Sequence, residues 1–428
     1  MNRSVVFAIL AVPFWVASQS IEISANHDSC MYKCGEPATF SIKVLDEDGN
    51  DLKEGTLNVV VNNFGAKEID KASFDLAGDE ALTCTGILDE PGFIKCVATV
   101  QLDKQYRGVC GVAVEPEKIE VASERPADFD AYWNAEVERL EKEVPLDPRV
   151  ERMDDFSTEK QESFRVSFAT FNNQRVYGFL SVPAGKGPFP VEVQVPGAGP
   201  GVITPQTWAA EQGYIRLVMN VHPYDPPADM DTLKKLYDEQ DQRLKELYGA
   251  PRYCQSGAAT RETYFYHPVI LGINRAVNWL AERSDVDQSR FYYTGTSQGG
   301  GFGLYLCGLN RNLVKGAIFV PALSDLLGFQ AGRTSGWPRL IEATPETIKD
   351  AAIKTAAYFD GAHFAARITC PVRLTAGFID EVCPPASVYA AYNALHVKDK
   401  DIVHGIGMPH RVFPKIYTQV NDNWLRQE

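Results

Sequence analysis

The stretch Arg290-Phe-Tyr-Tyr-Thr-Gly-Thr-Ser-Gln-Gly-Gly-Gly-Phe-Gly303 decides the fold. Apolar and aromatic residues lead into Gly295-Thr-Ser-Gln-Gly299, and apolar residues at helical spacing follow. This order predicts a strand, a sharp turn and a helix, and a Gly-x-Ser-x-Gly turn in that setting is a nucleophile elbow. The glycines are needed because strand and helix approach so closely that a Cβ would clash, while the serine takes a strained backbone conformation. We therefore predict that Ser297 projects a reactive hydroxyl.

A serine hydroxyl needs an imidazole to accept its proton, and the imidazole needs a carboxylate to fix its tautomer. In folds built around this elbow the chain order is Ser, acid, His, with the acid and the His each following a strand. Of the seven histidines, His410 lies in a loop after a predicted strand, whereas His404 lies within that strand. Asp380 follows the predicted strand 372–376. We predict a catalytic triad of Ser297, Asp380 and His410.

Two backbone N–H groups are candidates for an oxyanion hole. The N–H of Gln298 lies at the predicted helix start, where it points toward a tetrahedral oxyanion. The second candidate comes from Pro196-Gly-Ala-Gly-Pro-Gly201, a glycine-rich loop that follows the apolar strand 191–195. This class of fold places its second donor in such a loop, ahead of the elbow. We predict the N–H of Ala198, the alternative being a plain glycine turn.

Strands alternate with helices through residues 121–428, which predicts a mostly parallel sheet of the α/β-hydrolase type. The runs 164–168 and 176–182 predict an antiparallel pair that opens this sheet. Residues 230–248 have apolar side chains at helical spacing, in a long insertion before His267. That helix is either a lid or pocket wall, or a packed surface helix.

Residues 19–120 have a different pattern. Short runs of alternating or β-branched residues at 38–45, 56–61 and 93–100 are separated by turn residues, and no convincing helix is present. This spacing predicts an all-β, immunoglobulin-like sandwich. We interpret it as an accessory domain without a ligand of its own. The alternative is a carbohydrate-binding or lid-forming module.

The N-terminus predicts a signal peptide over residues 1–18. A basic residue, Arg3, precedes an apolar run that ends in Val16-Ala-Ser18. This is the order of a basic region, a short apolar region and small residues at a cleavage site. The run is too short to span a bilayer, and no other apolar segment approaches the necessary length of about 20 residues. We predict an exported protein, periplasmic or extracellular, without a membrane span.

The net charge narrows the class of binding partner. The net charge of −14 argues against nucleic acid or an anionic membrane as a partner, because both favour a basic face.

The cysteines suggest disulfides rather than a metal site. Five of the nine cysteines precede residue 111, which in an exported chain predicts one or two disulfides there. Cys84 and Cys96 flank a plausible hairpin and could face each other. Cys30-x-x-x-Cys34 lacks a second Cys or His pair at matching spacing, so we predict no metal and no cofactor.

From about Phe129 the chain resembles the acetyl xylan esterase/cephalosporin C deacetylase family of α/β-hydrolases, carbohydrate esterase family 7. Three stretches carry the resemblance: Gly295-Thr-Ser-Gln-Gly-Gly-Gly301, Tyr358-Phe-Asp-Gly-Ala-His-Phe-Ala-Ala-Arg367 and Asp380-Glu-Val-Cys-Pro-Pro-Ala-Ser-Val-Tyr-Ala-Ala-Tyr-Asn393. The resemblance implies the same triad and the same two oxyanion donors, Gln298 and Ala198. It also implies that Trp208 matches a tryptophan that the family has after its oxyanion loop.

The chain departs from the family pattern at three places. His222-Pro-Tyr224 replaces an Arg-Gly-Gln, Pro196-Gly-Ala198 replaces a His-Gly-Tyr, and Arg411 replaces a glutamate after the histidine. Backbone donors do not depend on side chains, so the predicted machinery survives these changes. We place Trp208 and Tyr224 in the substrate pocket. The family forms a ring-shaped hexamer, so an oligomer is consistent with the resemblance.

Together these features predict an exported serine esterase that removes small acyl groups, mainly acetyl, from a carbohydrate ester through an acyl-enzyme. An exported serine peptidase of the same fold is one alternative, although the sequence has neither a carboxylate cluster for a substrate amine nor sheet repeats. A non-catalytic carbohydrate-binding protein is another, and the Ser, Asp, His order argues against it.

Overall fold

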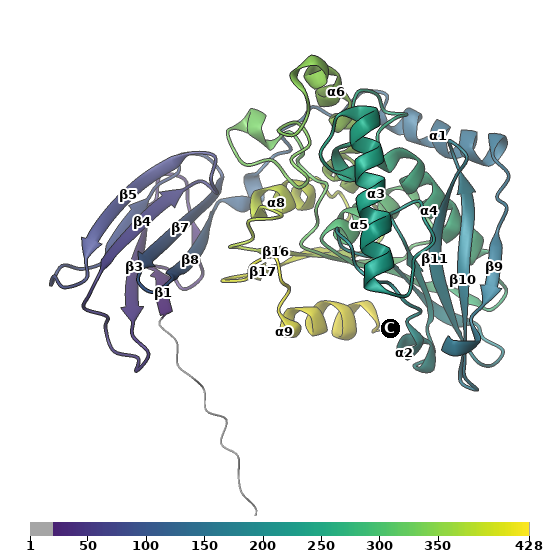
Figure 1. Cartoon of the computed structure of the whole chain (residues 1–428), viewed down its shortest axis with the longest axis horizontal. Helices are drawn as coiled ribbons and strands as arrows, with labels where there is room; N and C mark the ends of the chain where they lie inside the picture. Colours follow the sequence, from purple (N-terminus) through teal and green to yellow (C-terminus); the bar gives the residue numbers. More distant parts are fainter. Residues whose placement is uncertain (1–19, 428) are drawn as a thin grey trace, which may run out of the picture.

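The computed structural model describes residues 20–427, so the predicted signal peptide over residues 1–18 lies outside the described part. Figure 1 shows an all-β part, from β1 (Ser20–Ala25) to β8 (Gln105–Val114), beside a larger part in which helices flank a sheet. A short 3-10 helix, η1 (Pro116–Lys118), and an extended segment join the two parts.

The all-β part contains two sheets. In β3 (Ala38–Leu45) every second residue is buried, which is the period of a strand with one face against a core. One sheet has the order β1-β3-β6, with β6 at Thr83–Gly86. The other has the order β2 (Met31–Tyr32), β8, β7 (Gly92–Gln101), β4 (Thr56–Asn62) and β5 (Glu68–Asp75). All neighbours in both sheets are antiparallel except β2 and β8. The all-β prediction is confirmed.

The larger part is built on a sheet of nine strands in the order β17-β16-β15-β14-β12-β13-β11-β10-β9. Its strands are β9 (Arg149–Arg152), β10 (Gln161–Thr170), β11 (Gln174–Pro183), β12 (Phe189–Val195), β13 (Ile215–Met219), β14 (Val286–Thr296), β15 (Lys315–Phe319), β16 (Val372–Gly377) and β17 (Lys400–Gly405). The six strands β12 to β17 pair in parallel, and β9, β10 and β11 are antiparallel. The sheet is therefore mostly parallel, with the predicted antiparallel pair at its start.

Helices cover both faces of this sheet. They are α1 (Phe129–Glu143), α2 (Thr207–Glu211), α3 (Met230–Tyr248), α4 (Tyr266–Ala281), α5 (Gln298–Leu309), α6 (Lys349–Phe359), α7 (Gly361–Ala365), α8 (Pro385–Asn393), α9 (Pro414–Tyr417) and a π-helical segment η6 (Thr418–Leu425), with 3-10 turns η2 (Asp154–Phe156), η3 (Tyr253–Gln255), η4 (Gly328–Ala331) and η5 (Glu346–Ile348). In Figure 1, α5 and α8 lie above the sheet, and α9 and α2 lie below it. No helix within residues 20–427 has the length and apolar character that crossing a bilayer requires.

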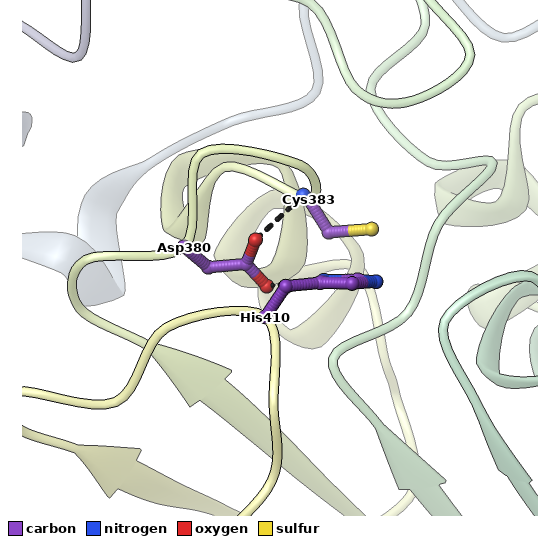
Figure 2. A group of neighbouring side chains, drawn as sticks. All are labelled: Asp380, Cys383 and His410. Atoms are coloured by element: carbon purple, nitrogen blue, oxygen red, sulfur yellow. Dashed lines mark hydrogen bonds and ion pairs between the residues drawn. The ribbon is translucent and has the colours of Figure 1, made fainter.

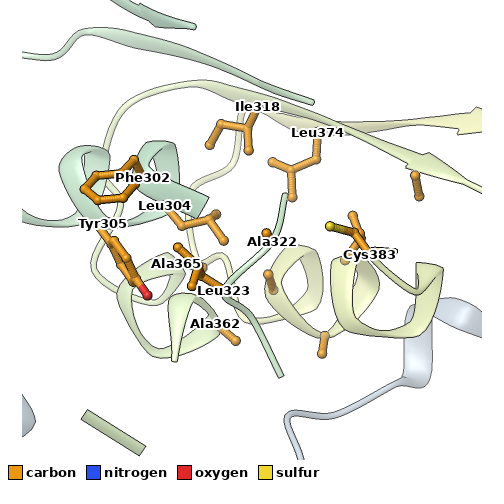
Figure 3. Packing of buried hydrophobic residues seen from close by; sticks show 14 of the residues in the cluster. Phe302, Leu304, Tyr305, Ile318, Ala322, Leu323, Ala362, Ala365, Leu374 and Cys383 are labelled. Atoms are coloured by element: carbon orange, nitrogen blue, oxygen red, sulfur yellow. The ribbon is translucent and has the colours of Figure 1, made fainter. Parts of the chain in front are cut away.

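Helix α5 is the central helix of the core. Nearly all of its residues are buried, because it is apolar on every side rather than on one stripe. Figure 3 shows its packing against the neighbouring strands and loops, where Phe302, Leu304, Tyr305, Ile318, Leu323 and Leu374 belong to one buried cluster. Each large apolar side chain buried here contributes about 1.5–3 kcal/mol to stability. The helix that begins at the elbow is thus fixed by the core.

The insertion helix α3 has the predicted bounds, residues 230–248. The carboxylate of Asp229 accepts the N–H of Thr232 and caps its start, and Gly249 ends it at a φ of 70°. Leu233 is its one fully buried side chain, so α3 is mainly a surface helix.

The all-β part packs against the loop that follows β16. A Cβ on Gly111 would lie 1.9 Å from the carbonyl oxygen of Phe378, so the two backbones touch. The rings of Phe93 and Phe378 meet edge to face at 5.3 Å. The buried ammonium of Lys95 lies 2.6 Å from Glu381, which Arg107 also contacts at 2.8 Å. The accessory part is therefore in direct contact with the loop that carries Asp380.

All nine cysteines are free thiols, so the prediction of one or two disulfides is wrong. Cys84 lies on β6 and Cys96 on β7, and these strands belong to different sheets rather than to one hairpin. Both side chains are buried in the core of the all-β part. They act there as small apolar residues, which is a common use of free cysteine.

The contact between the two parts predicts a stability effect. Replacement of Lys95 (Lys95→Met) removes an ion pair between a nearly buried ammonium and the half-exposed carboxylate of Glu381. We expect the free energy of unfolding to fall by about 1–3 kcal/mol, because a charge-assisted hydrogen bond is lost. The measurement is denaturant unfolding. Lys104→Met is the matched control, since Lys104 is exposed and lies over the Tyr106 ring alone. Equal unfolding midpoints for the two variants would contradict the prediction.

Candidate active site

Ser297 lies between β14 and α5, at the predicted turn. Its backbone has φ 60° and ψ −122°, a conformation that L-residues rarely adopt. The turn is held because the N–H of Ser297 donates to the Phe319 carbonyl at 2.9 Å. Both glycines are sterically required: a Cβ on Gly295 would lie 2.4 Å from the Gly299 carbonyl oxygen, and one on Gly299 would lie 2.0 Å from that of Val195. The serine side chain thus stands out from a strained, tightly packed turn.

Three side chains from three loops form one hydrogen-bonded chain. His410, in the loop after β17, places Nε2 at 2.8 Å from the Ser297 Oγ. Its Nδ1 lies 2.8 Å from Oδ2 of Asp380, which follows β16. Asp380 is fully buried, whereas the imidazole is 28% exposed. His404 lies within β17, and its ring packs against that of Phe378, with the ring centroids 5.6 Å apart. The predicted order of serine, acid and histidine is therefore brought together in space.

The carboxylate of Asp380 is oriented by its own loop. Its Oδ1 accepts the N–H groups of Val382 and Cys383, each at 2.9 Å, which leaves Oδ2 for the imidazole. Figure 2 shows the Cys383 side chain beside the imidazole of His410. The Cys383 thiol lies near Ser297, and burial raises the pKa of this thiol well above the usual value. The sequence prediction missed Cys383, although it belongs to the stretch Asp380-Glu-Val-Cys-Pro-Pro385 that carried the resemblance.

The side chains of Asp380, Cys383 and His410 each offer an atom within 4.8 Å of the others, and this donor set suits a transition metal. Their hydrogen bonds compete with such a role. Asp380 uses both oxygens, and His410 uses both ring nitrogens, within the chain that ends at Ser297. An ion bound by all three side chains would have to break that chain. These hydrogen bonds therefore suit proton transfer rather than metal binding.

The two predicted oxyanion donors flank Ser297. The N–H of Gln298 is at the first position of α5, where the helix leaves its N–H groups unpaired. Ala198 is exposed in the loop after β12. That loop borders the nucleophile, because a Cβ on Gly197 would lie 4.0 Å from the Cβ of Ser297. The geometry brings both backbone segments to the serine.

A cavity of about 250 Å³ lies beside these donors. It is lined by Gln298, by the loop that contains Ala198, by Leu233 of α3 and by residues after β13 that include His222 and Tyr224. Tyr224 stacks on His222, with ring centroids 5.2 Å apart. Helix α3 thus contributes to the wall of the pocket as well as to the surface. A larger cavity of about 620 Å³ lies between the all-β part and the larger part. Ser297, Asp380 and His410 line neither cavity, but the smaller one borders Gln298, the residue next to Ser297.

Trp208, predicted for the pocket, is not among the residues that line this cavity. It lies on α2 and is 43% exposed. The guanidinium groups of Arg426 and Arg216 lie over its indole at 4.9 Å and 5.9 Å. The structure therefore brings Tyr224 to the site and places Trp208 beside the C-terminal segment.

The sheet order and the elbow are those of an α/β-hydrolase, in which loops at the carboxyl ends of parallel strands carry the reactive groups. Residues 115–427 match the family model described as Acetyl xylan esterase (AXE1), and the chain belongs to this family of carboxylic ester hydrolases. The family expected from the sequence is confirmed.

Individual relatives agree with this family. The acetyl esterase Axe7A of Xylanibacter ruminicola is 28% identical over 422 residues, which cover 94% of this chain and 89% of that protein. Two solved structures share the fold. The acetyl xylan esterase from Paenibacillus sp. R4 has a TM-score of 0.60 and is 23% identical. Acetyl xylan esterase 1 from Thermoanaerobacterium sp. JW/SL YS485 has a TM-score of 0.59 and is 20% identical. Each comparison covers 73% of this chain and 98% of the other, so about a quarter of this chain has no counterpart in them.

Buried histidines predict how stability depends on pH. Burial lowers the pKa of His222 and of His363 to about 4, below the unfolded value of about 6.5. Between pH 6.5 and 4 the unfolded chain therefore binds protons that the folded chain does not. As the pH is lowered from 6.5 to 4, the free energy of unfolding should therefore fall, by about 2–3 kcal/mol for each histidine.

The measurement is denaturant unfolding at pH 7 and pH 4.5. His222→Phe keeps the ring packing and removes the titrating group, so it should lose about 2 kcal/mol less than the unaltered protein between these pH values. His396→Gln is the control, because His396 is exposed. If the free energy of unfolding falls between pH 7 and pH 4.5 by the same amount in His222→Phe as in the unaltered protein, the prediction for His222 is wrong.

Proposed function

We propose that this protein is a serine esterase that removes acetyl groups from acetylated carbohydrate, with Ser297 as nucleophile. The hydrogen-bonded chain from Asp380 through His410 to the Ser297 Oγ carries the proposal, because it makes an alcohol nucleophilic near neutral pH. Membership of the acetyl xylan esterase family supports the choice of an acetyl ester over other acyl derivatives.

The reaction begins when the Ser297 Oγ attacks the ester carbonyl and its proton passes to Nε2 of His410. Asp380 accepts the Nδ1 proton in a hydrogen bond and stabilises the imidazolium that forms. The negative oxygen of the tetrahedral intermediate is stabilised by the N–H groups of Gln298 and Ala198. His410 then gives its proton to the departing sugar oxygen, which leaves an acetyl group on Ser297.

Deacylation repeats these steps with water. His410 accepts a proton from water, whose oxygen attacks the acetyl carbonyl. As the second tetrahedral intermediate collapses, His410 returns that proton to the departing Ser297 Oγ, and acetate is released. The small cavity beside Gln298 supports a short acyl group. Among the described residues that line it there is no carboxylate to bind a substrate amine, which disfavours an aminopeptidase.

The assignment predicts the behaviour of Ser297→Ala. We expect turnover of 4-nitrophenyl acetate and of acetylated xylo-oligosaccharides to fall by about 10⁴-fold or more, because the residual rate comes from binding and the oxyanion donors alone. Acetate release is measured on purified protein whose thermal unfolding matches that of the unaltered chain. Cleavage of aminoacyl amides in preference to acetyl esters by the unaltered chain would favour the peptidase alternative, and turnover by the variant would exclude Ser297 as nucleophile.

Export is part of the proposal. The basic, apolar and small-residue order of residues 1–18 supports it. Expression of the full chain in a bacterial host, followed by N-terminal sequencing of the protein outside the cytoplasm, should give a start close to residue 19. A product that keeps Met1 and stays in the cytoplasm would contradict export.

A further inference from the structure

The side chain of Gln298 is held by two tyrosines. It is fully buried, and its Oε1 accepts the hydroxyl of Tyr253 at 2.6 Å and that of Tyr266 at 2.7 Å. Its Nε2 donates to the carbonyl of Gly197 at 3.5 Å. The residue whose backbone N–H faces the oxyanion thus also reaches the loop that carries the second donor.

Tyr253 makes a further contact with that loop. The backbone N–H of Gly199 lies near its hydroxyl, and the hydroxyl donates its own proton to Gln298 at 2.6 Å. A phenol hydroxyl offers one donor and can also accept. Gly197 and Gly199 are the two chain neighbours of Ala198. The Gln298 side chain therefore holds the Gly197 side of Ala198 by a hydrogen bond, and Tyr253 lies beside the Gly199 side.

These tyrosines are rigid. Tyr253 and Tyr266 are 1% and 0% exposed, and burial raises the pKa of both phenols well above the usual value, so they keep their protons. The Tyr253 ring packs against His222 at 4.6 Å and against Phe265 at 5.0 Å. Ala198, in contrast, is exposed in a loop rich in glycine. The loop is therefore the exposed side of this contact and Tyr253 the buried side.

We propose that Tyr253 and the Gln298 side chain are positioning residues that fix the Ala198 N–H relative to the Gln298 N–H and so preorganise the oxyanion hole. This inference rests on the proposed function. A donor that is already oriented stabilises the developing charge without reorganisation, and such donors act mainly in the transition state. Their loss should therefore lower kcat far more than it raises KM.

The test is Tyr253→Phe, which keeps the ring and removes the hydroxyl that donates to Gln298 and lies near the Gly199 N–H. On an acetyl ester we expect kcat to fall by about 10–100-fold with KM within about twofold. The affinity of a boronic acid that forms a tetrahedral adduct on Ser297 should fall by the same factor, because the adduct resembles the transition state. The matched control is Tyr305→Phe: Tyr305 is also fully buried, and its hydroxyl donates to the Phe359 carbonyl instead.

Tyr266→Phe is the second variant. It removes one donor to Gln298 and leaves the Gly199 contact in place, so kcat should fall by less than in Tyr253→Phe and by more than in Tyr305→Phe. It also keeps the inference testable if Tyr253→Phe does not fold. A kcat in the folded tyrosine variants equal to that of Tyr305→Phe, or a loss confined to KM, would overturn the inference. If the unaltered protein does not hydrolyse acetyl esters, or Ser297→Ala does, the proposed function fails instead.

Discussion

The contact between Gly299 and the carbonyl oxygen of Val195 is the constraint on which the site depends. A Cβ on Gly299 would lie 2.0 Å from that oxygen, so the first turn of α5 touches the end of β12. Helix α5 carries the Gln298 N–H, and β12 leads into the loop with Ala198. One steric contact, which only glycine allows, therefore sets the separation of the two oxyanion donors.

The parallel sheet explains how residues far apart in the sequence meet. Ser297 and His410 are 113 positions apart, and His410 and Asp380 are 30 apart. Strands β14, β16 and β17 lie on the same side of the sheet order, and parallel strands end at the same edge. The loops after them consequently gather at one place. The buried helix α5 then fixes that edge against the core.

The all-β part packs directly against the larger part and is not joined to it by the linking segment alone. Lys95 and Phe93 contact Glu381 and Phe378, which flank the acid Asp380 in its loop. Two solved structures with the same fold cover 73% of this chain, so about a quarter of it has no counterpart in them. In this protein the all-β part stabilises the loop that carries Asp380 through these contacts. The all-β part contributes no side chain to the hydrogen-bonded chain of Ser297, His410 and Asp380.

The sequence by itself determined most of the elements and named the candidate site residues that the structure brings together. Periodicity gave the antiparallel pair β10 and β11 and the helix α3, because such patterns depend on near neighbours. The glycines around Ser297, and the positions of Asp380 and His410 after predicted strands, predicted the candidate site. These signals also depend only on near neighbours in the sequence.

Only the tertiary structure decided what depends on contacts between distant segments. The hydroxyls of Tyr253 and Tyr266 on Gln298, the approach of Gly111 to Phe378, and the separation of Cys84 and Cys96 onto different sheets have no local signature. Trp208 follows the oxyanion loop in sequence, yet it lies against Arg426 at the other end of the chain. Such pairings arise from how the sheet and its loops pack, which residue order alone does not specify.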